Sequence, residues 1–135
     1  MSIEENKKIV QKFYDAIQVG DYELVKELCH PEFVFYHQID TPHFGAEGFT
    51  ASEAKNFAAF EGFSMKIENL ITQGNRVAAY LVFEGNQSDE IFGHQPAGAK
   101  LRFSLMMMLT IKDGKIIEKR AHFDRLDIMN QLEVL

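Results

Sequence analysis

Four polar side chains that can take part in acid–base chemistry stand at alternate positions near the C-terminus: Glu118, Arg120, His122 and Asp124. Side chains alternate between the two faces of a strand, so this spacing predicts one polar row on a strand that ends at Asp124. A carboxylate inside an apolar cavity has a raised pKa and can take a proton from the carbon next to a carbonyl group. An imidazole or a guanidinium beside it could hold the developing charge or bind a substrate oxygen.

The same polar row has two other interpretations. A row of polar side chains on a sheet usually faces water. Asp124 also comes directly before a predicted helix over 126–132, where its carboxylate could act as an N-cap or pair with Arg125 or Arg120. The sequence leaves open whether Asp124 faces a cavity or caps that helix.

Three further residues have reactive side chains. His37, on a predicted strand over 33–39, could act as a base, or it could bond to backbone or water as an ordinary strand histidine. Tyr14 could offer its hydroxyl to a pocket, although a core tyrosine with a satisfied hydroxyl is commoner. Cys29 lies within a helical pattern and is interpreted as a small core residue, because no positive partner is suggested beside it.

Local patterns predict the elements that must position these residues. Ser2 and Glu5 form a capping box for a helix over 3–19, which Gly20 ends. A second helix runs to 28 and a third begins at Thr50 or Ser52. Strands over 64–72, 76–87, 101–111 and 116–124 follow, joined by tight turns. This order predicts an α+β fold, with three N-terminal helices packed on a curled antiparallel β-sheet and a short C-terminal helix.

Aromatic side chains are candidates for the lining of a cavity between the helices and the sheet. We expect Phe35, Phe57 and Phe103 to contact a substrate there, together with Tyr14 and Arg120. Periodicity alone does not fix the directions of these side chains. The sequence therefore predicts an aromatic lining without specifying one substrate.

The strand over 101–111 is apolar on both faces, and Met106, Met107 and Met108 lie at its centre. Both faces must therefore be covered. The chain's own helices can cover one face, and a second copy of the chain can cover the other, which predicts a homodimer through the sheet face. The alternative is a monomer in which the helices and the C-terminal tail cover both faces.

Length and composition set the broad class. At 135 residues the chain suits one domain over 1–135, large enough for a core and one cavity. The net charge of -6 and the scattered basic residues argue against nucleic acid as a partner. Without a signal peptide or a long apolar run, we expect a soluble, cytoplasmic protein with no membrane contact. Five histidines without a ligand spacing, and no phosphate-binding glycine loop, predict neither a metal nor a cofactor.

Motifs in the last third of the chain carry a family resemblance. The loop Phe92–Lys100, the hairpin Asp113–Ile116, and the pair Phe123-Asp124 followed by a helix with Gln131-Leu132 together resemble the SnoaL-like polyketide cyclases of the NTF2-like superfamily. The resemblance implies an NTF2-like cone. It also implies cofactor-independent acid–base chemistry on a carbonyl compound, by aldol cyclisation or isomerisation, with Asp124 as the general acid/base.

The sequence departs from this family at two positions. Arg120 and His122 stand where a tryptophan and another aromatic residue are common in the family, which favours a more polar or anionic ligand. His37 lies where the related ketosteroid isomerases place a base, but Phe13 and Met107 occupy their other two functional positions, which argues against steroid isomerisation. The second hypothesis is a non-catalytic NTF2-like protein that binds a ligand in the cone or serves in dimerisation.

Overall fold

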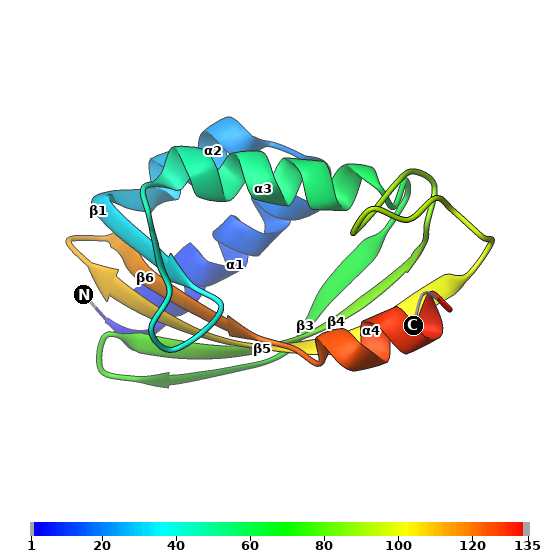
Figure 1. The fold of residues 1–135 in the computed structure, drawn as a ribbon. Helices are drawn as coiled ribbons and strands as arrows, with labels where there is room; N and C mark the ends of the chain where they lie inside the picture. The colour runs from blue at the N-terminus through cyan, green and yellow to red at the C-terminus, as the bar shows by residue number, and fades with distance from the viewer. Residues whose placement is uncertain (1, 134–135) are drawn as a thin grey trace.

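A computed structural model describes residues 2–133 and shows helices laid over one face of a curved sheet (Figure 1). The elements in chain order are α1 (Ile3–Val19), α2 (Tyr22–Leu28), β1 (Cys29–Tyr36), β2 (Pro42–Phe44), α3 (Ala46–Ala58), β3 (Ser64–Gln73), β4 (Arg76–Asn86), β5 (Lys100–Lys112), β6 (Lys115–His122) and α4 (Arg125–Gln131). The predicted α+β class and the predicted cone of helices packed on a curled sheet are confirmed.

The six strands form one sheet in the order β2-β1-β6-β5-β4-β3. The β3–β6 strands pair antiparallel as a meander, whereas β1 pairs with β6 in parallel. The sheet is therefore antiparallel, as predicted, except at the parallel pair of β1 and β6. β1 follows α2 directly in the chain and lies between β6 and the edge strand β2, with which it pairs antiparallel.

Local signals explain most element boundaries. The Ser2 hydroxyl accepts the Glu5 N–H at 3.1 Å in the predicted capping box, and Gly20 ends α1 in the left-handed region with φ 76°. The predicted start of α3 is wrong, because the helix begins at Ala46 after Gly45. The Thr50 hydroxyl bonds back to the Ala46 carbonyl at 2.9 Å within the helix, so it is not free to cap a helix start.

Helices α1 to α3 cover the concave face of the sheet, and no helix within residues 2–133 covers the opposite face (Figure 1). On β5, Met107 points to the core with 4% exposure, whereas Met106 and Met108 point outward with 51% and 41% exposure. The described chain therefore covers one of the two apolar faces that the sequence indicated. The predicted homodimer stays a prediction.

Cys29 is the first residue of β1 rather than part of a helix, and it is buried. Burial raises the pKa of its thiol to about 12, which makes it unreactive as a nucleophile. None of the helices within residues 2–133 is long and apolar enough to cross a membrane.

Candidate functional site

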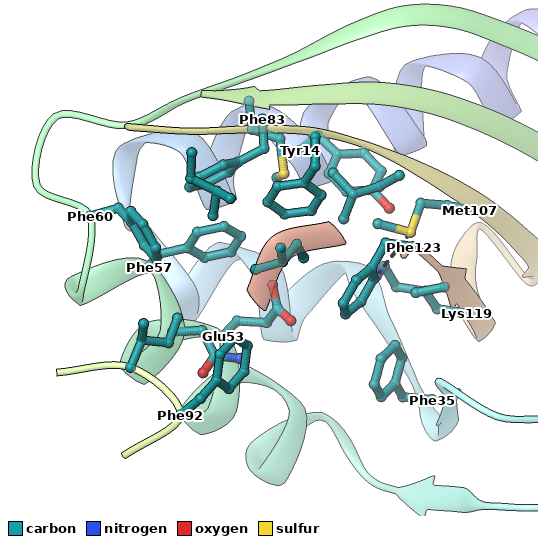
Figure 2. A pocket seen from close by; sticks show the side chains of 18 residues that line it. Tyr14, Phe35, Glu53, Phe57, Phe60, Phe83, Phe92, Met107, Lys119 and Phe123 are labelled. Atoms are coloured by element: carbon teal, nitrogen blue, oxygen red, sulfur yellow. Dashed lines mark hydrogen bonds between the residues drawn. The ribbon is translucent and has the colours of Figure 1, made fainter. Parts of the chain in front are cut away.

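The cone encloses an apolar pocket of about 110 Å³ between α3 and the concave face of the sheet (Figure 2). Its wall takes side chains from α1, α3, α4 and all strands but β2, and from the loop between β4 and β5. The lining residues are Tyr14, Phe35, Glu53, Asn56, Phe57, Phe60, Met65, Phe83, Ile91, Phe92, Leu101, Phe103, Leu105, Met107, Lys119, Ala121, Phe123 and Ile128. Two of the eighteen can carry a charge near neutral pH, Glu53 and Lys119.

Glu53 reaches the pocket from the middle of α3. Its carboxylate points into the space between the aromatic side chains (Figure 2). Burial among these side chains raises the pKa of the Glu53 carboxyl, and the positive charge of Lys119 offsets part of that rise. A carboxylate whose pKa is raised is a stronger base than an ordinary glutamate, so it is suited to take a proton from a substrate.

Lys119 reaches the pocket from β6 and is 2% exposed. Its ammonium group lies 3.7 Å from the Met107 sulfur, a weak acceptor, and 5.0 Å and 5.2 Å from the ring centres of Phe35 and Phe49. Burial lowers the pKa of Lys119, and the charge of Glu53 counteracts this shift. Within residues 2–133 no carboxylate oxygen lies within the 4.0 Å of an ion pair with this nitrogen.

Tyr14 adds a second buried donor. It is 3% exposed, and its hydroxyl has no hydrogen-bond partner among the described residues. Its ring centre lies 5.9 Å from the Lys119 nitrogen. Burial and the nearby Glu53 raise the pKa of the phenol well above its usual range, so the hydroxyl keeps its proton.

These three groups indicate what the pocket can bind and which reaction it can support. Buried donors without a good acceptor are uncommon in folded proteins, and a ligand oxygen is one way to satisfy them. The Tyr14 hydroxyl and the Lys119 ammonium can bind such an oxygen, and Glu53 can transfer a proton beside it. No group of three or more metal-binding side chains occurs within the described part of the chain.

The predicted site residues fall into two groups. Tyr14, Phe35, Phe57 and Phe103 line the pocket, as expected from the sequence. Asp124 does not: it is exposed, and its carboxylate accepts the Asp127 N–H at 3.0 Å as the N-cap of α4. The expectation that Asp124 points into the cone is wrong, because β6 ends at His122 and the alternative of a helix cap holds.

Arg120 and His122 also lie outside the pocket. Alternation along β6 sends Lys119 and Ala121 into the cone, so Arg120 and His122 face the other side of the sheet. There the Arg120 guanidinium stacks 4.0 Å from the Tyr36 ring centre and pairs with a Glu118 oxygen at 3.1 Å. His122 is exposed, so the predicted substrate contacts of both residues are corrected.

His37 is exposed just beyond the end of β1 and does not line the pocket. Its Nδ1 lies 3.1 Å from Nε2 of His43, and the two rings stack with their centres 4.8 Å apart. The expectation of a pocket base at His37 is therefore wrong in position. The chain turns away from the cone after Tyr36 to form the short pairing with β2.

Sequence reasoning missed the two charged residues that do line the pocket. Glu53 precedes Asn56, Phe57 and Phe60 at the spacing of one helical face, and all four line the cavity. Lys119 shares its strand face with Ala121. In both elements, the signal in the sequence was one charged residue that shares a face with apolar residues which line the pocket.

Comparison with known proteins agrees with this architecture. The chain is similar to TsrD from Streptomyces laurentii, with 23% identity over 100% of this chain and 99% of that chain and a TM-score of 0.88. It is also similar to AclR, a candidate hydroxylase from Streptomyces galilaeus (20% identity, 99% of each chain, TM-score 0.89). IdmH, a candidate polyketide cyclase from Streptomyces antibioticus, is 25% identical over 96% of this chain and 99% of that chain, with a TM-score of 0.83.

A search of curated proteins gave no match. The model of the SnoaL-like polyketide cyclases, in contrast, matches residues 8–132, which run from within α1 to the end of α4. On this match, the chain belongs to the SnoaL-like polyketide cyclase family.

Proposed function

We propose that this protein is a cofactor-independent enzyme that moves a proton next to a carbonyl group of a small molecule, with Glu53 as the general acid/base. One observation carries the proposal: a carboxyl group with a raised pKa faces two buried donors across an apolar cavity. Membership of the SnoaL-like polyketide cyclase family supports small-molecule chemistry in the cone. The proposal moves the acid–base role from Asp124, which caps α4, to Glu53.

In the proposed reaction, the substrate carbonyl oxygen accepts hydrogen bonds from the Tyr14 hydroxyl and the Lys119 ammonium. Ionised Glu53 takes a proton from the adjacent carbon, and the electron pair of the broken C–H bond moves into the carbonyl to give an enolate. The two donors stabilise the enolate oxygen in a site of low polarity. Protonated Glu53 then returns its proton.

The atom that receives the proton from Glu53 decides which class of product forms. If the enolate is conjugated with a C=C bond, Glu53 can deliver the proton to the far carbon of this conjugated system, the double bond shifts, and the net reaction is an isomerisation. If the enolate carbon instead attacks a second carbonyl of the same molecule, a new C–C bond forms, and Glu53 protonates the resulting alkoxide in an aldol cyclisation. Both reactions need the same three groups and no electron donor or acceptor.

The test is hydrogen–deuterium exchange at the carbon next to the carbonyl of acetophenone or phenylacetone, two ketones of a single ring, followed by proton NMR in D₂O. We expect the wild-type protein to accelerate exchange, and Glu53→Gln to reduce the rate roughly a hundredfold or more, the usual worth of a general base. The matched control is Glu47→Gln, the same substitution at an exposed position of α3, which keeps the wild-type rate.

The pH profile gives a second measure of the assignment. We expect a bell shape: the acid limb lies above the ordinary pKa of a glutamate because burial raises the Glu53 pKa. The basic limb lies below the ordinary pKa of a lysine because burial lowers the Lys119 pKa. Saturable binding of both ketones without any exchange would instead favour the second hypothesis, a non-catalytic binding protein.

We also propose that two copies associate through the exposed sheet face. Met106 and Met108 project from β5, and Tyr80 and Ile71 project beside them from β4 and β3. Neighbouring exposed apolar side chains on one sheet face are typical of an interaction surface.

A further inference from the structure

We infer that the pocket takes a compound of a single ring whose only charged group is an anionic oxygen, either a carboxylate or an enolate. This inference names the ligand class of the site described above and rests on the proposed function for the chemistry done there. It follows from the size of the cavity, the shape of its wall and the balance of its charged groups.

The size of the cavity limits the ligand to one ring. Its volume is about 110 Å³. An apolar cavity of about 150 Å³ in another protein accommodates one benzene molecule, so this pocket has room for one small ring with minor outward movement of its wall. A molecule of two or more fused rings would need whole side chains to be displaced, at the cost of overpacking.

The wall favours a flat apolar ring. Phe57, Phe83 and Phe103 form a continuous aromatic surface, with ring centres 6.0 Å apart between Phe57 and Phe83 and 5.1 Å apart between Phe83 and Phe103. Phe123 continues this surface, 5.9 Å from Phe103. Aromatic rings gain attraction from offset or edge-to-face contact with another ring.

The charged groups favour one anionic oxygen. Among the lining residues only Lys119 is a cation, and its ammonium has the weak Met107 sulfur as its hydrogen-bond partner. The Tyr14 hydroxyl has no partner among residues 2–133. An anionic oxygen bound to both groups would satisfy two buried donors and neutralise the buried ammonium.

Glu53 does not oppose such an anion. Its raised pKa means that it takes up a proton easily, and a second negative charge in the pocket would raise this pKa further. Binding of a carboxylate at neutral pH is therefore expected to be coupled to proton uptake by Glu53. A substrate enolate forms in the same place when Glu53 takes the proton from the substrate itself.

A second hollow, between α1 and the start of β3, lacks these features. It is lined by Gln11, Tyr14, Asp15, Gln18, Ser64, Met65, Lys66 and Ile67. The Gln18 amide is already occupied, since it donates to the Phe63 carbonyl and accepts the Met65 N–H, both at 2.8 Å. The ligand class is therefore argued from the pocket in the cone.

The first experiment compares probes of equal shape and different charge by isothermal titration calorimetry: benzoate, benzamide and benzamidine. We expect benzoate to bind roughly tenfold to a hundredfold tighter than benzamide, the worth of a charge-assisted hydrogen bond, and benzamidine to be weakest. Lys119→Met removes the preference for benzoate, whereas the control Lys112→Met, at an exposed position of β5, keeps it. Equal affinities of the wild type for benzoate and benzamide would overturn the charge argument.

The second experiment varies size with benzoate, 2-naphthoate and 9-anthracenecarboxylate. We expect 2-naphthoate to bind roughly tenfold more weakly than benzoate because of overpacking, and the three-ring acid to be weaker still. Phe57→Ala enlarges the cavity and shifts the preference toward 2-naphthoate, whereas the control Phe44→Ala, at an exposed site on β2, does not. Tighter binding of the three-ring acid than of benzoate would overturn the single-ring inference.

The third measurement is the proton count on benzoate binding, from titrations in buffers of different ionisation enthalpy. Wild-type protein is expected to take up protons at neutral pH, and Glu53→Gln to abolish the uptake. Unchanged proton uptake in Glu53→Gln would contradict the inference that Glu53 is the group that takes up the proton. These three experiments measure binding and not catalysis. If the protein binds benzoate selectively but does not exchange a ketone proton, the inferred ligand class holds and the proposed catalysis is wrong.

Discussion

Glu53 and Lys119 place two ionisable groups in a cavity that is otherwise aromatic and aliphatic. Burial disfavours the charged form of each. Among the described residues the two groups form no ion pair within 4.0 Å, so their mutual attraction offsets only part of the free-energy cost of burying them. Such an arrangement costs stability that apolar residues of similar volume would not cost. We interpret this cost as the price of a reactive site.

The raised pKa of Glu53 links stability to pH at this residue. The folded-state pKa lies above the ordinary value of 4.5, so the folded protein holds the proton more tightly than the unfolded chain does. This contribution to stability is fully present below the ordinary value and is lost as the pH rises through the folded pKa. Glutamine cannot ionise, so we expect the stability of Glu53→Gln not to show this fall in this pH range.

Urea unfolding of wild type and Glu53→Gln across a pH series measures the effect. The stability of the wild type relative to the variant should fall as the pH rises from the ordinary glutamate range to the folded pKa of Glu53. Over the same range the exchange rate of the wild type should rise, because the same ionisation creates the base. Parallel stability curves for the two proteins would show that the pocket does not raise the pKa of Glu53.

At the scale of elements, the end of β6 decides which residues enter the cone. Lys119 and Ala121 point inward, and the strand ends at His122, so the carboxylate of Asp124 is free to cap α4. The helix in turn presents Ile128 to the pocket wall. Asp124 therefore acts on the pocket through the position of α4.

Two substitutions at Asp124 separate a cap from a catalyst. Asparagine caps helices as well as aspartate does, so Asp124→Asn should keep both the melting temperature and the exchange rate. Asp124→Ala should lower stability by about 1 kcal/mol, the usual worth of an N-cap, with little change in kcat per folded molecule. The measurements are thermal unfolding and ketone exchange. A loss of roughly a hundredfold in exchange rate in Asp124→Asn, with stability unchanged, would return the acid–base role to Asp124.

At the scale of the whole molecule, the two faces of the sheet have different surroundings. The concave face is covered by α1 to α3 (Figure 1). The convex face carries Ile71 at 64% exposure, Met106 at 51%, and Tyr80 and Met108 at 41% each. Cross-strand pairing places these side chains in adjacent rows, since Met106 pairs with Tyr80, and Ala78 pairs with both Ile71 and Met108. They therefore form one patch.

This patch predicts the effect of a charge on association. Wild-type protein should sediment as a dimer, and Met106→Glu should shift it to monomer, because a carboxylate would be buried in the interface without a partner. Met106→Leu is the control and should remain dimeric. Analytical ultracentrifugation over a range of concentrations gives the answer. A monomeric wild type at every concentration would contradict the proposed association.

The motifs with short-range causes were predictable from sequence. The capping box at Ser2 and Glu5 and the stop at Gly20 need only residues a few positions apart. The same is true of the hairpin at Asp113-Gly114, which joins β5 to β6. The aromatic lining at Phe35, Phe57 and Phe103 was also predictable in kind, because large apolar residues on alternating or helical faces turn inward.

The position of the acid–base site was not predictable in this way. Glu53 and Lys119 lie on different elements, and their meeting depends on how α3 crosses the sheet and on which face of β6 is turned inward. A shift of one residue in a strand exchanges its two faces. Because Lys119 faces the cone, Arg120 and His122 face the other side of the sheet. The sequence by itself determined the elements and the apolar character of the cone, because these depend on local pattern. The tertiary structure alone decided which charges the cone encloses, because that depends on the packing of one layer against another.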